Sequence, residues 1–317
     1  MKESIEKTKM YIEEQVYEGR PIFIGESFTK YQKVYLSTNE NIKDYIEIID
    51  TNNSFNALSV LGSGDHVFNL ICKRIINIDT FDINKLTEFY VFGLRYACIL
   101  KYNYKEYLKI LNIISSETSS LEEITTVVND LLPYMDNKYR KYWSIINEFN
   151  YKIQKENNTN LNLFNLLTLN TRNIKYVIFR NNYLLNEESY NKLRNNILKS
   201  NVTFKNKDIM DIPNSFNDNY DLILLSNIFD YMYKKFGLGF KYNDAKNFID
   251  KLKNMLIDNG LLFLNYIFNY SSDKTIRNYI INSSNITLSD LPNSEVIKID
   301  SDMGMNQIKD GVLILKK

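Results

Sequence analysis

Short apolar runs alternate with amphipathic segments along most of the chain. The run ALSVL (57–61) stops at a Gly-Ser-Gly turn (62–64), and residues 65–73 that follow have helical spacing. The Ile-rich run 75–81 then predicts a second buried strand. A strand, a glycine turn, a helix and a strand make a βαβ unit, which indicates a parallel sheet.

Helical spacing is also expected at residues 5–17 and, almost without interruption, from about 85 to 155. Residues 21–35 between them read as an extended piece with a turn. The long helical stretch is broken near Ser115 and near Pro133. We interpret residues 85–155 as a helical insertion, because strand-like runs return only after it.

The second half of the chain predicts more strands and two helices. In chain order these are helix 189–199, strand 202–205, strand 221–225, helix 245–257 with a stop at Asn259 and Gly260, strand 261–268, and an antiparallel hairpin of 296–300 and 311–317 around Gly304. The fold class is therefore α/β: a mostly parallel, Rossmann-like sheet with an antiparallel edge hairpin at its C-terminus and a helical insertion. This ending is usual for a class I methyltransferase-like sheet.

Composition narrows the function classes. Apolar residues make up 44% of the 317 residues and charged residues 24%, the balance of a globular chain. Lys and Arg number 39 against 38 Asp and Glu, so no net field attracts nucleic acid. We also expect no metal site and no disulfide, because Cys72 and Cys98 lie in apolar helix faces without paired spacing.

The same patterns bear on location. The N-terminal segment is charged throughout, unlike a signal peptide, and the apolar runs are far shorter than the roughly 20 residues of a membrane helix. We expect a cytoplasmic protein without a transmembrane segment. Peripheral contact with a membrane surface stays open, and the oligomeric state is not indicated.

The first strand–turn–helix predicts a ligand site. Glycines at 62 and 64 let a ligand approach the backbone at a helix N-terminus, together with Ser63 between them. Asp82 follows at the end of the second strand, where a carboxylate can accept both hydroxyls of a ribose. Together these features favour nucleoside binding over a plain tight turn.

The spacing argues against a pyrophosphate. The dinucleotide fingerprint G-x-G-x-x-G lacks its third glycine here, since Val67 occupies that position. Asp65 directly behind the glycines suits the cationic end of a ligand, such as the amino group of a methionine moiety. Its alternative role is a helix N-cap, and the sequence leaves both open.

Two further strand ends add candidates. Asp208 and Ile209 follow the third strand, where such folds place a side chain against the adenine amino group; a surface turn is the alternative. The fourth strand runs into Ser226 and Asn227, at the edge of the sheet where ligands bind. This segment lacks the Pro-Pro-Tyr of enzymes that methylate amino groups on bases.

Several of these segments carry a family resemblance. GSGDHVFNL (62–70), IDTFDIN (78–84) and DLILLSNIFDYM (221–232) resemble the S-adenosylmethionine-dependent aminocarboxypropyl transferases of the betaine-lipid type, as does GESFTKY (25–31). In that family the N-terminal segment that corresponds to residues 25–31 lies over the cofactor. It typically carries Trp where this chain has Phe28. The resemblance covers about half of the chain in four short islands.

The resemblance implies an enzyme with S-adenosyl-L-methionine as cofactor and a small-molecule or lipid acceptor. It implies an N-terminal helix and cofactor-covering segment in residues 1–50, and a cofactor-binding domain in residues 51–317. The resemblance adds Glu26 and Asn84 to the cofactor-binding candidates. The others are Gly62, Ser63, Gly64, Asp65, Asp82, Asp208, Ile209, Ser226 and Asn227.

The reaction would be displacement at the cofactor's sulfonium, where aligning the reactants supplies much of the acceleration. An oxygen nucleophile would benefit from a general base. The candidates are Asp230 and Tyr231, after the fourth strand, whereas the only histidine, His66, is favoured as an ordinary helix residue.

Three alternatives stay open. Transfer of the aminocarboxypropyl group would leave methylthioadenosine, whereas a methyltransferase would leave S-adenosylhomocysteine. A cofactor-binding or protein-interaction module without catalysis is the alternative of another class. A nicotinamide dehydrogenase is disfavoured by the missing third glycine.

Overall fold

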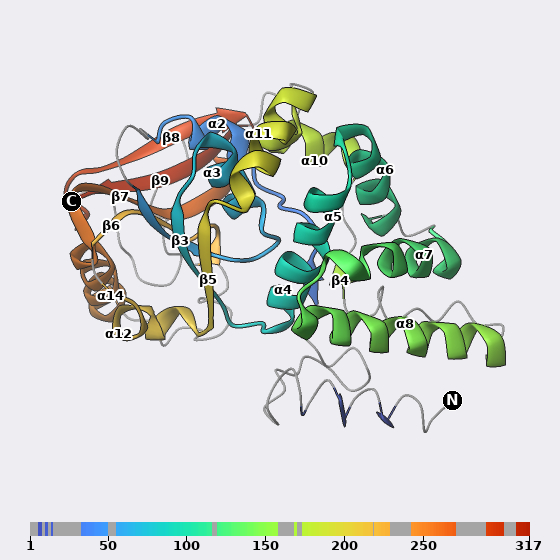
Figure 1. Ribbon diagram of the computed structural model, residues 1–317. Coiled ribbons are helices and arrows are strands. Elements are labelled where there is room, and N and C mark those ends of the chain that lie inside the picture. Colours follow the sequence, from blue (N-terminus) through green and yellow to red (C-terminus); the bar gives the residue numbers. More distant parts are fainter. Residues whose placement is uncertain are drawn as a thin grey trace.

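The computed structural model describes most of the chain as an α/β fold. It describes residues 6–7, 10–11, 14, 33–49, 55–115, 119–157, 168–169, 173–217, 219–228, 242–270, 290–300 and 309–317. A seven-stranded sheet lies on one side of the molecule and a group of helices on the other (Figure 1). The expected α/β class, mostly parallel sheet and C-terminal antiparallel pair are confirmed.

The strand order makes this fold Rossmann-like. The sheet consists of β2 (Asn56–Val60), β3 (Asn77–Asp82), β5 (Asn201–Asn206), β6 (Tyr220–Leu224), β7 (Leu256–Tyr270), β8 (Ser294–Asp300) and β9 (Lys309–Lys316). Its order is β5-β3-β2-β6-β7-β9-β8. The first five are parallel neighbours, and β9 pairs antiparallel with both β7 and β8. The chain therefore starts at the centre of the sheet, goes outward through β3 and β5, and returns to the other side of β2.

Alternation of side chains divides the core into two layers. Ala57, Leu222 and Phe263 face the cluster that contains α3 (Asp65–Lys73) and the helices of the insertion. Their neighbours Leu58 and Ile223 face the opposite cluster, which is completed by α14 (Tyr242–Asn254). Since successive residues of a strand point to opposite faces, each buried strand contributes to both layers.

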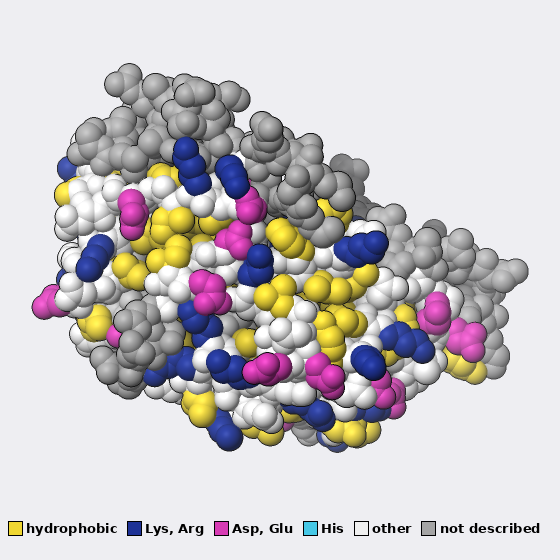
Figure 2. Space-filling model, turned by 90° about the horizontal axis from the view of Figure 1, so that it is seen from above, with side chains coloured by type: hydrophobic (Ala, Val, Ile, Leu, Met, Phe, Trp, Pro, Cys, Tyr) yellow, Lys and Arg dark blue, Asp and Glu magenta, His cyan; other side chains and the backbone are white. Residues whose placement is uncertain are grey.

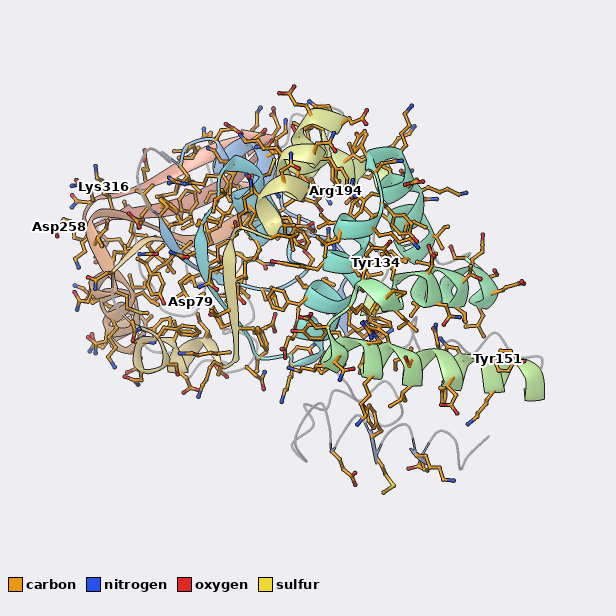
Figure 3. All side chains as sticks on the ribbon, viewed as in Figure 1. Asp79, Tyr134, Tyr151, Arg194, Asp258 and Lys316 are labelled. Atoms are coloured by element: carbon orange, nitrogen blue, oxygen red, sulfur yellow. The ribbon has the colours of Figure 1, made fainter. Side chains whose placement is uncertain are left out.

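Most of the chain that connects β3 to β5 in the sequence is helical. The helices are α4 (Leu86–Glu88), the π-helix η3 (Phe89–Arg95), α5 (Tyr96–Lys101), α6 (Tyr104–Ser115), α7 (Leu121–Leu131), the 3₁₀ turn η4 (Leu132–Tyr134), α8 (Asn137–Asn157), α10 (Ile174–Arg180), the 3₁₀ turn η5 (Asn182–Leu184) and α11 (Glu187–Ile197). The expected helices and both breaks are present. Figure 3 places Tyr151, on α8, at the opposite end of the molecule from Asp258 and Lys316 of the sheet.

Short elements complete the described chain. They are β1 (Val34–Tyr35) and β4 (Thr168–Leu169), which form a separate parallel pair, α2 (Ile42–Ile46), the 3₁₀ turn η6 (Ile209–Asp211) and α12 (Ile212–Ser215). The sequence pattern did not predict α2, α10 or the β1–β4 pair. Most of the N-terminal helix expected at 5–17, and the turn at Gly304, lie outside the described residues.

The prediction of a helix at 245–257 is wrong at its C-terminal end. The helix ends at Asn254, and Asn259 and Gly260 do not terminate a helix but lie within β7. Tyr220 pairs with Leu256 and Leu222 with Leu261, so four residues of β7 bulge out between two ladder positions. Asn259 adopts a positive φ of 64° there. Asn and Gly tolerate the left-handed region in a bulge as well as at a helix end, which is why the pattern was ambiguous.

The described surface carries charged side chains of both signs (Figure 2), as the nearly equal numbers of acidic and basic residues predict. On the face in Figure 2, acidic and basic side chains are interspersed with hydrophobic ones, and neither charge forms a continuous patch among the described residues. No helix in the described part of the chain is long and apolar enough to cross a membrane. Cys72 and Cys98 are both free and buried.

Candidate functional site

A cavity of about 420 Å³ opens at the carboxyl ends of the central strands. Strands β3 and β6 flank β2 on opposite sides, so the strand order reverses at β2, and the cavity lies at this point. Open α/β sheets bind ligands at such a reversal. Most of the predicted cofactor-binding residues that the structure describes line it: Gly62, Ser63, Asp82, Asn84, Asp208, Ile209, Ser226 and Asn227. Its volume falls in the range of small-molecule sites.

The two glycines of the first turn have different reasons to be glycine. Both have positive φ, 49° at Gly62 and 84° at Gly64. A Cβ on Gly64 would lie 2.7 Å from Cγ1 of Val91, so packing against η3 excludes a side chain. A Cβ on Gly62 would meet nothing within 4 Å. Gly62 therefore borders the open cavity, whereas Gly64, which is not among the lining residues, serves the packing of the turn.

Asp82 ends β3 and holds the two adjacent loops. Its Oδ2 accepts the backbone N–H of Gly62 at 3.0 Å, and its Oδ1 accepts that of Asn84 at 2.8 Å. Burial raises the pKa of Asp82 to about 6, against the lowering effect of the hydrogen bonds from Asn84, Gly62 and Thr87. Each carboxylate oxygen has a second lone pair, so Asp82 can still accept the hydroxyls of a ribose.

Apolar side chains flank this carboxylate. Val60 of β2, Phe81 of β3 and Ile209 of η6 line the cavity. Asp208 caps η6 by accepting the N–H of Met210 at 3.1 Å and also borders the cavity. The two interpretations of Asp208 are thus compatible, because one oxygen can cap the turn while the residue faces a ligand.

Asp65 is not the N-cap of α3, and it lies outside the cavity lining. The N-cap of α3 is Gly64, and the Asp65 side chain is fully buried outside the cavity lining. Its Oδ1 accepts Nη2 of Arg95 at 2.9 Å and the hydroxyl of Tyr183 at 2.7 Å. Its Oδ2 accepts the N–H of Thr38 at 2.6 Å and the Ser63 hydroxyl at 2.7 Å. These partners occupy the carboxylate, so Asp65 ties the turn to its surroundings.

The electrostatics of Asp65 follow from this arrangement. Burial alone would raise the pKa of the Asp65 carboxyl, but the Arg95 charge and the hydrogen bonds from Ser63, Arg95 and Tyr183 outweigh it. The pKa of Asp65 therefore lies below its ordinary value, and the group stays ionised as half of a buried ion pair.

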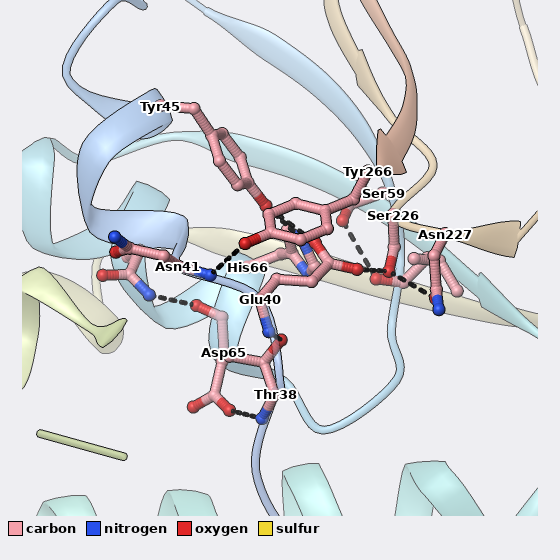
Figure 4. Close-up of polar contacts among 12 residues, drawn as sticks. Thr38, Glu40, Asn41, Tyr45, Ser59, Asp65, His66, Ser226, Asn227 and Tyr266 are labelled. Carbon is pink, nitrogen blue, oxygen red and sulfur yellow. Dashed lines mark hydrogen bonds and ion pairs between the residues drawn. The ribbon is translucent and has the colours of Figure 1, made fainter. Parts of the chain in front are cut away.

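A second buried carboxylate, Glu40, lines the cavity on the other side of the turn. Its Oε1 accepts the hydroxyl of Ser226, and its Oε2 accepts that of Tyr45 at 3.1 Å (Figure 4). Nε2 of His66 lies 3.2 Å from the same Oε2 and 2.6 Å from the Tyr45 oxygen. The sequence analysis did not identify Glu40, because the segment before α2 carries no periodic pattern or glycine signal.

Ser226 marks the end of β6 with an unusual backbone. Its φ is 61°, which is uncommon for a residue with a side chain and recurs at functional sites. Its carbonyl accepts the N–H of Tyr266 at 3.1 Å while its hydroxyl reaches Glu40. This conformation turns Ser226 and Asn227 toward the cavity.

The segment 33–40 forms another wall of the cavity, with Lys33, Tyr35 and Thr38 among its lining residues. The cofactor-covering role was expected just before it, at 25–31, which lies outside the described residues together with Glu26. The catalytic candidates Asp230 and Tyr231 also lie outside them. His66, favoured as an ordinary helix residue, does border the cavity from the first turn of α3.

No protein-family model matches the chain, and no curated protein matches it significantly. Among the described residues, no group of three His, Cys, Asp or Glu side chains is arranged to hold a metal ion. The site is therefore characterised by its own geometry: a cavity of about 420 Å³ that Asp82 and Glu40 both line.

Proposed function

We propose that the protein is a transferase that binds S-adenosyl-L-methionine in this cavity and transfers a group from its sulfonium. The observation that carries the proposal is Asp82, which ends β3 beside the Gly62 backbone and among apolar walls. A ribose would bind the carboxylate, and the adenine would lie between Phe81 and Ile209. The topological position of the cavity supports the same placement.

Two carboxylates beside the glycine turn disfavour a dinucleotide, although Lys33 and Lys207 also line the cavity. Glu40 and Asp82 line the cavity, and Asp65 lies buried in the first turn of α3. Glu40 and Asp82 would oppose a pyrophosphate at the helix N-terminus, which is where dinucleotides place it, whereas Arg95 neutralises Asp65. Val67, at the position of the missing third glycine, is buried in the core. The antiparallel pair β8–β9 supports a class I methyltransferase-like sheet.

For the transferred group we propose 3-amino-3-carboxypropyl, with a small molecule or a lipid as acceptor. Three of the segments that resemble the betaine-lipid transferases contribute Gly62, Asp82 and Ser226 to one cavity. The acceptor would attack the γ-carbon of the methionine moiety, the bond from that carbon to sulfur would break with its electron pair left on sulfur, and methylthioadenosine would leave. Methyl transfer is the alternative, since attack at the methyl carbon uses the same bound cofactor.

The first experiment is calorimetric titration with S-adenosylmethionine. We expect the wild type to bind and Asp82→Asn to bind at least tenfold more weakly, because the amide cannot accept both ribose hydroxyls as the carboxylate does. Asp211→Asn is the matched control, since Asp211 is exposed, lies near Asp208 and is not among the lining residues. Absence of binding to the wild type would contradict the proposal.

A product assay separates the alternatives. The protein is incubated with S-adenosylmethionine and a cell extract as the source of acceptor, with and without diacylglycerol vesicles. Accumulation of methylthioadenosine supports aminocarboxypropyl transfer, whereas S-adenosylhomocysteine as the only product establishes a methyltransferase. Tight binding without either product would favour a non-catalytic cofactor-binding module.

A further inference from the structure

Glu40 is a buried carboxylate without a strong counter-charge. Only 1% of its surface is exposed, and it borders the cavity. Its hydrogen-bond donors Ser226 and Tyr45 are neutral hydroxyls. Within the part of the chain that the structure describes, the ion-pair partner of Glu40 is His66 rather than a lysine or an arginine. Buried carboxylates are normally paired with a cation, so this arrangement calls for one.

Asp65 provides the comparison within the same turn. It is as deeply buried as Glu40, yet Arg95 lies 2.9 Å from it and it is not among the residues that line the cavity. One carboxylate therefore has its permanent cation inside the protein, and the other faces a space that a ligand can enter. A cationic ligand group would find its counter-charge at Glu40.

The order of the strands sets which end of a ligand reaches Glu40. Asp82 belongs to β3 and Ser226 follows β6, and these strands flank β2 on opposite sides. Neighbouring strands are about 4.8 Å apart, so the two strand ends are separated by about 10 Å. A ligand whose ribose binds Asp82 thus extends its other end across the glycine turn toward Ser226 and Glu40.

We propose that Glu40 binds the α-ammonium group of the methionine moiety, an inference that rests on the proposed function. An ammonium has three N–H donors, and charge-assisted hydrogen bonds to a carboxylate are about twice as strong as neutral ones. A sulfonium has no N–H or O–H to donate. Glu40 consequently selects ligands that carry the amino acid and discriminates against methylthioadenosine, which lacks it.

Three ligands test this assignment by calorimetry. S-adenosylmethionine carries ammonium and sulfonium, S-adenosylhomocysteine carries the ammonium alone, and methylthioadenosine carries neither. We expect Glu40→Gln to weaken the first two by about tenfold to 100-fold, the loss of a hydrogen bond between charged groups, and methylthioadenosine by less than twofold. Glu47→Gln is the control, because Glu47 has a side chain that is 65% exposed and lies outside the cavity lining.

Each other outcome overturns the assignment. Equal weakening of all three ligands would show that Glu40 shapes the cavity without recognising charge. Weakening of S-adenosylmethionine alone would assign Glu40 to the sulfonium, and no weakening would leave it without a role in binding. If the wild type binds none of the three, the proposed function itself has failed, which is a distinct result.

A measurement on the unaltered protein covers the case in which Glu40→Gln does not fold. The probe is the deaminated analogue of S-adenosylhomocysteine, in which hydrogen replaces the ammonium group and the carboxylate remains. We expect the wild type to bind S-adenosylhomocysteine at least tenfold more tightly than this analogue. Equal affinities would overturn the assignment.

Discussion

Three carboxylates near one glycine turn have three different environments. Asp65 is neutralised by Arg95, Asp82 accepts backbone N–H groups of two loops, and Glu40 lies among hydroxyls and a histidine. Residue type and spacing could not separate them, because the differences depend on how the folded chain places hydrogen-bond donors and Arg95 around each acid. At the residue scale, Asp82 and Glu40 line the cavity without an arginine or lysine partner among the described residues, whereas Asp65 is paired with Arg95.

Asp82 should make stability depend on pH. Its pKa is raised by burial from 3.8 to about 6 in the folded protein, so the folded state binds the proton more tightly than the unfolded state. The resulting stabilisation is fully present below about pH 4, is lost as pH rises to about 6, and amounts to about 3 kcal/mol at most. We expect urea unfolding to show this decline in the wild type and not in Asp82→Asn. Parallel pH profiles for the two proteins would contradict it.

The two turn glycines should respond differently to alanine. Gly64→Ala combines a left-handed backbone with a contact of 2.7 Å to Val91, so we expect it to destabilise the fold by about 2–5 kcal/mol. Gly62→Ala carries only the backbone cost of about 1–2 kcal/mol, but its methyl group enters the cavity. Urea unfolding and titration with S-adenosylmethionine should therefore show a folding defect for Gly64→Ala and a binding defect for Gly62→Ala. Equal loss of stability in both variants would argue against this division.

At the scale of elements, the sequence predicted the helices and strands whose residues follow a regular hydrophobic pattern. Every strand of the sheet was located, because each is a short run rich in apolar or β-branched residues, although β7 begins at Leu256 rather than at 261. The bulge at Asn259 was taken for a helix end, since the residues that bulge are those that end helices. Glu40 was missed because its position depends on α2 packing against α3, a tertiary contact without a local signal.

Arg95 connects several of these elements. Besides Asp65, its guanidinium donates to the carbonyl of Ser63 and to the hydroxyls of Tyr107 and Tyr183, which come from α6 and η5. Removing one partner of a buried ion pair leaves the other charge uncompensated. We therefore expect Arg95→Met to lower the free energy of unfolding by about 3–5 kcal/mol.

The control for this pair is a double-mutant cycle. Asp65→Asn combined with Arg95→Met should cost clearly less than the sum of the two single changes, because no unpaired charge remains. Urea unfolding of the four proteins measures the coupling. Strict additivity would show that the ion pair does not connect the elements energetically.

At the scale of the whole molecule, the helices between β3 and β5 share their core with the sheet. The larger apolar cluster contains α3 and the sheet residues Leu222 and Phe263 together with Trp143 of α8. Cys72 on α3 and Cys98 on α5 belong to this same cluster. A continuous core of this kind favours cooperative unfolding over independent opening of the helical region.

The two thiols can report on this cooperativity. Burial raises the pKa of Cys72 to about 11 and that of Cys98 to about 12, so neither forms an appreciable amount of thiolate at pH 8 in the folded protein. Reaction with a thiol reagent then requires opening of the core. In the single-cysteine variants Cys72→Ala and Cys98→Ala, we expect the remaining thiol to become reactive over the same range of urea, with the same free energy of opening within about 0.5 kcal/mol. If Cys98 reacts at clearly lower urea than Cys72, the helices between β3 and β5 unfold before the sheet, and the cavity would then rest on a domain that is stable without them.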